Sequence, residues 1–166
     1  MKKLLFLMST MLVLTLTSFS QTQQINIYPV INGEIIYTSV VNVDSTKSNE
    51  LYVRANEWFV NTFKSAKDVI QLSDKEAGKI IGKGVFSTGL FTIHFTVEIQ
   101  TKDGKYKYAF SNFICKSMEG SHYENTCNLE EWLNSKKIRK IDENINANVL
   151  NLIADLKKAM VVNDKW

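Results

Sequence analysis

Residues 91–113 read FTIHFTVEIQTKDGKYKYAFSNF, and this stretch decides the fold class. Its first ten residues alternate between apolar and polar side chains, which is typical of a strand with one buried face. The Asp103-Gly104 pair that follows favours a two-residue hairpin loop. With that loop the apolar faces of the two arms coincide, and His94 is placed opposite Phe113. The stretch therefore predicts a long β-hairpin with one face toward the core.

The other face of the hairpin is polar and is a candidate binding surface. It carries hydroxyl, imidazole, carboxylate and ammonium groups on two strands. Its candidate residues are Thr92, His94, Thr96, Glu98, Lys107 and Ser111. A polar sheet face of this kind is often simply solvated. Because His94 and Glu98 share this face, they are also candidates for acid–base work, although the sequence places no nucleophile beside them.

Apolar periodicity on either side of the hairpin predicts the remaining elements. Strands are expected at 33–43, 68–73 and 79–86, and helices at 49–64, from Asn128 onward, and at 142–162. The main elements follow the order β-α-β-β-β-β-α, which predicts an α+β domain with an antiparallel sheet and its helices packed on one face. In the first helix, Arg54 falls outside the apolar stripe and is expected to face water.

Two glycines, Gly82 and Gly84, lie inside the strand expected at 79–86. Glycines within a strand indicate a bulge or a close approach of another group to the backbone. The pair also resembles the start of a phosphate-binding loop, but position 87 is Ser and no helix follows, so the resemblance is poor. No other motif indicates a cofactor, and none is expected.

The first 20 residues have the three parts of a secretory signal peptide. Lys2 and Lys3 precede the uncharged run 4–16, and Ser18-Phe19-Ser20 offers a cleavage site before Gln21. We therefore expect export to the periplasm or the extracellular medium; the alternative is an uncleaved N-terminal anchor. After an extended leader at 21–32, one domain is expected over 33–163, with no transmembrane span after signal cleavage.

The charge of the expected mature chain is close to neutral. The full sequence has 20 Lys and Arg against 17 Asp and Glu, and removal of the signal peptide takes away two lysines and no acid. The resulting balance of 18 to 17 argues against nucleic acid as a partner. The densest basic run, 136–140, is interpreted as a solvated connector.

Both cysteines, Cys115 and Cys127, lie in the expected exported part, with eleven residues between them. In an oxidising compartment such a pair predicts a structural disulfide. Two buried free thiols remain an alternative. A metal site that includes His122 is a weaker one, because the spacing lacks the close pairs of zinc sites. No metal is expected.

Several motifs between residues 33 and 84 share a pattern with a known family. They are Gly33-x-Ile35-x-Tyr37, Ser48-x-Glu50-Leu51-Tyr52-x-Arg54-Ala55-x-x-Trp58, Phe63-x-Ser65-Ala66-Lys67-x-Val69-Ile70-Gln71, Asp74-Lys75-Glu76 and Ile81-Gly82-Lys83-Gly84. Together with the signal peptide, they resemble a family of exported bacterial proteins catalogued as a domain of unknown function with a TATA-binding-protein-like (TBP-like) fold. The resemblance implies a helix on a curved sheet, and it brings no catalytic residue and no DNA-binding role.

Three functions remain open after this comparison. The first is a non-catalytic binding module of the cell envelope, for an unknown ligand or an envelope protein. The second is a hydrolase with a site around His94 and Glu98, although the usual hydrolase motifs are missing. The third is a structural subunit with an exposed apolar patch, for which Tyr123, Trp132 and Trp166 are the residues to check.

Overall fold

The structure is a computed structural model that describes residues 27–63, 66–89, 91–117, 126–132 and 139–161. Several sequence predictions lie outside these residues. They concern the signal peptide at 1–20, most of the leader, His122, Tyr123, residues 136–138 of the basic run, and Trp166.

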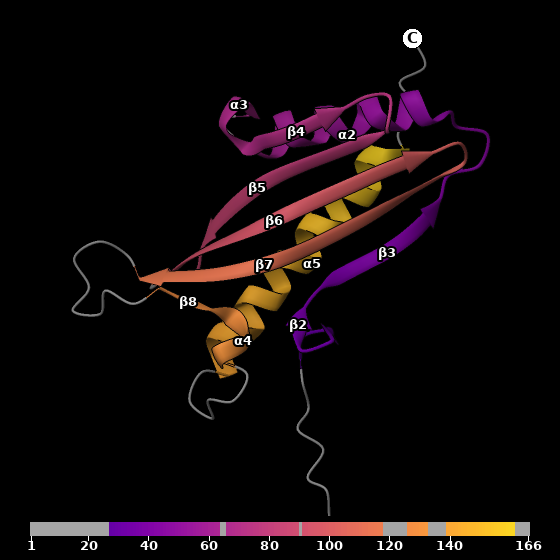
Figure 1. The fold of residues 1–166 in the computed structure, drawn as a ribbon. Coiled ribbons are helices and arrows are strands. Elements are labelled where there is room, and N and C mark those ends of the chain that lie inside the picture. Colours follow the sequence, from indigo (N-terminus) through magenta and orange to yellow (C-terminus); the bar gives the residue numbers. More distant parts are fainter. Residues whose placement is uncertain (1–26, 64–65, 90, 118–125, 133–138, 162–166) are drawn as a thin grey trace, which may run out of the picture.

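One antiparallel sheet forms the centre of the molecule, with the strand order β3-β7-β6-β5-β4 and with β8 paired to β7 (Figure 1). Its strands are β3 (Tyr37–Asn42), β4 (Ile70–Asp74), β5 (Lys79–Ser87), β6 (Phe91–Lys102), β7 (Lys105–Ser117) and β8 (Thr126–Asn128). The short strands β1 (Val30–Ile31) and β2 (Glu34–Ile35) pair only with each other among the described residues. The sheet is curved, as the family resemblance implies.

The helices gather on one face of this sheet, so the predicted α+β class is confirmed. They are α2 (Ser48–Thr62), α3 (Ala66–Val69), α4 (Leu129–Trp132) and α5 (Arg139–Val161). Helix α2 packs on β5, β6 and β7 and on α5. In Figure 1 the strands pass in front of α5, and the face without helices is toward the viewer.

The core lies between the two long helices and the sheet. The apolar stripe of α2 buries Leu51, Ala55, Trp58 and Phe59, as its spacing predicts. The matching stripe of α5 buries Ile145, Val149, Leu156 and Met160. Against them stands an aromatic layer from the hairpin, in which Phe95 stacks between Phe110 and Phe113 with centroid distances of 6.0 and 5.9 Å. The buried apolar side chains of the strands thus point toward the helices, and the opposite face of the sheet is not covered by a core.

The two strand glycines make room for this aromatic layer. A Cβ atom on Gly82 would lie 2.4 Å from Cε1 of Phe59. One on Gly84 would lie 2.2 Å from Cζ of Phe95 and 2.9 Å from Cε1 of Phe63. Carbon atoms normally approach to about 3.5–4.0 Å. The predicted close approach is therefore made by phenylalanine rings.

The hairpin register is confirmed up to Thr96 and corrected beyond it. The strands pair Thr101 with Tyr106 and Thr96 with Ser111, as the two-residue loop requires. His94, however, lies opposite Ile114 and not opposite the predicted Phe113. The reason is a bulge at Asn112, whose φ of 54° adds a residue to β7. The bulge turns Phe113 toward the core and leaves Ile114 on the face without helices.

Arg54 corrects a second expectation, since its side chain is only 9% exposed. Its guanidinium donates a hydrogen bond of 2.7 Å to the carbonyl of Met160, near the end of α5, and pairs with Glu50. Helix carbonyls in the last turn lack partners within the helix, and a cation is favoured there. Arg54 therefore caps the end of α5 from α2. The apolar periodicity of α2 alone does not reveal this contact.

Two smaller differences concern short elements. Residues 68–69, expected in a strand, belong to the helical turn α3, and the strand begins at Ile70. The short strand β8 was not expected, because its three residues show no periodicity and are defined only by pairing with β7. The short helix expected after Asn128 is confirmed as α4.

The hairpin loop also holds the start of α2. The Asp103 carboxylate accepts hydrogen bonds from the Ser48 amide at 2.8 Å and from Lys47 Nζ at 3.0 Å. These two donors lower the pKa of Asp103 below 3.8. An amide in the first turn of a helix has no partner within the helix, so the loop supplies a cap from a distant part of the chain. The contact fixes the helix end against the sheet.

Candidate functional site

The face of the sheet that carries no helix, here called the open face, is the candidate binding surface. Thr126 and Asn128 of β8 lie on this face opposite Lys116 and Ile114, and its other side chains come from alternate positions of five strands. They are Thr38, Val40 and Asn42 of β3; Lys105, Lys107, Ala109, Ser111, Ile114 and Lys116 of β7; Thr92, His94, Thr96, Glu98, Gln100 and Lys102 of β6; Lys79, Ile81, Lys83, Val85 and Ser87 of β5; and Leu72 and Asp74 of β4. This face lies toward the viewer in Figure 1.

The open face is strongly basic for a chain that is close to neutral. It carries six lysines, namely Lys79, Lys83, Lys102, Lys105, Lys107 and Lys116. Its acids are Glu98 and Asp74. Residues 21–166 hold 18 basic and 17 acidic residues, so the positions outside the open face hold 12 and 15. The fold therefore separates charge and concentrates positive charge on this face.

Neutral polar groups stand between the lysines. In one row across the sheet, Lys107 and Lys79 flank Gln100. Gln100 Nε2 donates to the Glu98 carboxylate at 2.6 Å, and Lys79 Nζ lies 3.1 Å from the same carboxylate. The single acid in the middle of the face is thus already paired, and the remaining lysines face solvent.

All six residues predicted for the candidate face lie on the open face. Lys107 is exposed, and the other five, Thr92, His94, Thr96, Glu98 and Ser111, are half-buried among their neighbours. The structure adds five lysines that were not predicted as part of the face. The hairpin pattern could have identified Lys102 and Lys105, whereas Lys116 reaches this face only through the bulge at Asn112 and the lysines of β5 required the strand order. Linear charge density missed all of them, because they are spread over 38 residues.

His94 lies in an apolar row of the open face, between Val85 of β5 and Ile114 of β7. Burial among these neighbours and the nearby Lys116 ammonium lower the pKa of His94 below 6.5. The imidazole is therefore neutral at pH 7. Among the described residues, no carboxylate hydrogen bonds it.

The arrangement does not assemble the acid–base pair that a hydrolase would need. Thr96 lies between His94 and Glu98 along β6, and the β-bulge occurs in the same interval. The carboxylate of Glu98 is already held by Lys79 and Gln100. Within the described ranges, no hydrogen bond links His94 to Glu98. His94 and Glu98 therefore lie on the same face of the sheet but do not form a common acid–base site.

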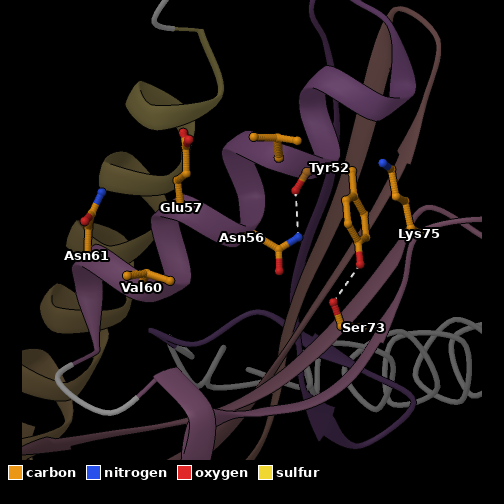
Figure 2. Close-up of a pocket in the computed structure, with 8 residues that line it drawn as sticks. Tyr52, Asn56, Glu57, Val60, Asn61, Ser73 and Lys75 are labelled. Atoms are coloured by element: carbon orange, nitrogen blue, oxygen red, sulfur yellow. Dashed lines mark hydrogen bonds between the residues drawn. The ribbon is translucent and has the colours of Figure 1, made fainter.

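A shallow pocket of about 370 Å³ lies between α2 and β4, away from these residues (Figure 2). Its lining residues are Tyr52, Val53, Asn56, Glu57, Val60, Asn61, Ser73 and Lys75. Its floor is closed by a hydrogen bond of 2.6 Å between the hydroxyls of Tyr52 and Ser73. Asn56 Nδ2 donates to the Tyr52 carbonyl at 2.9 Å, so the polar groups nearest the floor are already paired.

The two cysteines face each other across the β7–β8 pair. Cys115 is fully buried, Cys127 is half-buried, and both are free thiols. Burial, with contributions from Cys127 and Asp142, raises the pKa of Cys115 to about 12. Burial also raises the pKa of Cys127. No group of three His, Cys, Asp or Glu side chains suited to a metal is found in the described part of the chain.

Of the three residues predicted for a structural interface, Trp132 lies within the described residues. Trp132 is half-buried and packs edge-on against Phe91, with a centroid distance of 5.1 Å. It therefore belongs to the end of the core rather than to an open patch. Among the described helices, none has the length and hydropathy of a membrane-crossing segment.

Comparisons with known proteins agree with this geometry. The model of the family described as a domain of unknown function with a TBP-like fold, DUF4468, matches residues 37–116. A crystal structure of a TBP-like protein from Parabacteroides distasonis superposes with a TM-score of 0.69 at 20% identity, covering 81% of this chain and 97% of that chain.

A crystal structure of a DUF4468 family protein from Bacteroides ovatus gives a TM-score of 0.67 at 17% identity, covering 86% of this chain and 95% of that chain. At these identities the two structures show the fold alone. No protein with a curated description matches the sequence significantly. Residues 37–116 therefore belong to the DUF4468 family, whose fold is TBP-like.

Proposed function

We propose that the protein is an exported, non-catalytic binding module whose open face holds an acidic glycan of the cell envelope. The observation that carries the proposal is the segregation of charge: six lysines and two acids lie on the open face, while the rest of residues 21–166 is net acidic. A one-signed surface attracts a ligand of the opposite sign and orients it during encounter. An anionic partner fits this face, and a cationic one does not.

The shape of the open face favours an extended ligand. Strand β6 has 12 residues, which corresponds to a length of about 40 Å. The lysines are spread over that length, from Lys105 at the hairpin loop to Lys116 at the other end of β7. Small-molecule sites are normally concave and enclose their ligand. A long basic surface suits a polymer whose charges repeat along it.

The side chains between the lysines favour a glycan over a nucleic acid. Proteins that bind single strands stack bases on aromatic side chains, and minor-groove binders often insert large apolar wedges. The aromatic side chains of the described strands point into the core, and the open face presents Thr, Ser, Asn and Gln beside the lysines. Hydroxyl and amide groups can exchange hydrogen bonds with sugar hydroxyls.

The location of the protein is part of the proposal. The three-part pattern of residues 1–20 supports export, and acidic glycans are accessible to a protein outside the cytoplasm. Export would also place the facing Cys115 and Cys127 thiols in an oxidising compartment, where a disulfide bond between them is expected.

The test measures the binding of dextran sulfate to the mature protein by titration calorimetry at two salt concentrations. We expect binding that weakens as salt rises and no binding to neutral dextran. The variant K105E/K107E reverses two charges on the open face and should lower the affinity at least about tenfold. The matched control K140E/K158E reverses two exposed charges on α5 and should bind as the wild type does.

Polyglutamate and a single-stranded oligonucleotide are run beside the glycan. Tighter binding to either of them than to dextran sulfate would replace the glycan with that class of partner. Equal losses of affinity in the two charge-reversal variants would refute the open face as the site. Absence of binding to all anionic probes would refute the binding module proposed here.

A further inference from the structure

The register of β7 and β8 brings the two cysteines of the chain together. Cys115 lies directly opposite Cys127, between the pairs Ile114–Asn128 and Lys116–Thr126. Side chains of directly opposed residues lie on the same side of a sheet, with Cβ atoms about 4.5–5.5 Å apart. A disulfide needs Cβ atoms only slightly closer than this.

The segment that carries Cys127 closes one end of the core. It comprises β8 and α4, residues 126–132, and β8 pairs with β7 over three residues. Within it, Leu129 is fully buried, and the Glu130 carboxylate accepts a hydrogen bond of 2.9 Å from the Ile35 amide of β2. The Trp132 ring packs on Phe91. A segment with so little backbone pairing depends on these few contacts to stay in place.

We propose that Cys115 and Cys127 form a disulfide bond that acts as a covalent latch, holding the β8–α4 segment over the end of the core. This proposal rests on the proposed export, because the disulfide bond would form in an oxidising compartment. Its chemistry needs a disulfide compound as the oxidant, either a small molecule or a thiol–disulfide oxidoreductase.

The reaction proceeds in two exchanges. The sulfur of Cys127, which is the more exposed, attacks the oxidant; its S–H proton is released, a mixed disulfide forms, and one thiol of the oxidant leaves. The sulfur of Cys115 then attacks Cys127 Sγ, and the second thiol leaves as the Cys115 proton is lost. In total two protein thiols and one disulfide compound give one protein disulfide and two thiols.

The burial of the two sulfurs slows both steps in the folded protein. Burial keeps the thiolate form of each cysteine scarce at pH 7. We therefore expect the latch to close slowly, and once closed it is protected from reductants by the same burial.

The test starts from the reduced full chain, which is incubated with oxidised glutathione. We expect the intact mass to fall by two hydrogens, exchange of the Ile35 amide with solvent to slow by about tenfold, and the melting temperature to rise by about 8 °C. The variant Cys115→Val lacks the second thiol and should accumulate a stable glutathione adduct on Cys127. Cys127→Ser, at a half-buried position, should show neither product.

Three results would overturn the latch. The first is two free thiols after prolonged oxidation, and the second is a glutathione adduct on the wild type that Cys115 does not resolve. The third is a disulfide that leaves the exchange of Ile35 unchanged. Export is tested separately on protein recovered from the cell envelope. If the disulfide bond forms in purified protein with oxidised glutathione while protein recovered from the cell envelope is fully reduced, the export proposal fails and the latch stands.

Discussion

Substitution of Gly82 by alanine tests the packing of α2 on the sheet. The new methyl group would lie 2.4 Å from Cε1 of Phe59 and 3.0 Å from its Cζ, so the ring must retreat by about 1 Å to reach ordinary contact. Overpacking of this kind costs about 1–3 kcal/mol. We therefore expect Gly82→Ala to lower the free energy of unfolding by about 2 kcal/mol, measured by urea denaturation.

The matched control is Lys83→Ala, since Lys83 is the next residue of the same strand and is exposed; its effect should stay within about 0.5 kcal/mol. Phe59→Leu removes the ring atoms in question. In the double variant the methyl group gains room, and the combined loss should be smaller than the sum of the single losses by at least about 1 kcal/mol. Strictly additive losses, or a Gly82→Ala protein as stable as the wild type, would refute the proposed contact.

Two further predictions concern single side chains. Tyr106→Phe removes a buried hydroxyl that has no hydrogen-bond partner among the described residues, so urea denaturation should show stability unchanged or raised by up to about 1 kcal/mol. Tyr37→Phe removes a hydroxyl that donates to Asn146 at 2.6 Å and should lower stability by about 1 kcal/mol; the reverse order would contradict this account. The His94 pKa, lowered by burial and by Lys116, should appear below 6.5 in an NMR titration. Because folding lowers the pKa of His94, its contribution to stability is present above pH 6.5 and is lost as the pH falls through the folded-state pKa. An NMR titration midpoint above 6.5 would be inconsistent with the burial of His94.

The parts of the fold that could be predicted from sequence are those whose signal is local. The alternation within 91–102 and the Asp103-Gly104 loop define a strand and its partner, and the pairing of Thr101 with Tyr106 follows from them. Helix α5 was predicted to within three residues at its start and one at its end for the same reason. Local periodicity is sufficient where an element buries one continuous face.

The parts that could not be predicted depend on contacts between distant segments. The bulge at Asn112 results from a left-handed backbone in the middle of a strand, which the alternation of the flanking residues does not announce. The burial of Arg54 depends on the end of α5, 106 residues further on. The basic character of the open face is the same kind of property, because it arises only when β5 and β7 are placed on either side of β6.

An NMR titration of the isotopically labelled mature protein with dextran sulfate locates the binding surface residue by residue. If the open face binds the glycan, the largest amide shifts lie on β5, β6 and β7, with Lys105, Lys107 and Lys116 among them, and they diminish as salt is added. Shifts concentrated on Asn56 and Ser73 at the pocket between α2 and β4, or spread evenly over the surface, would contradict binding at the open face.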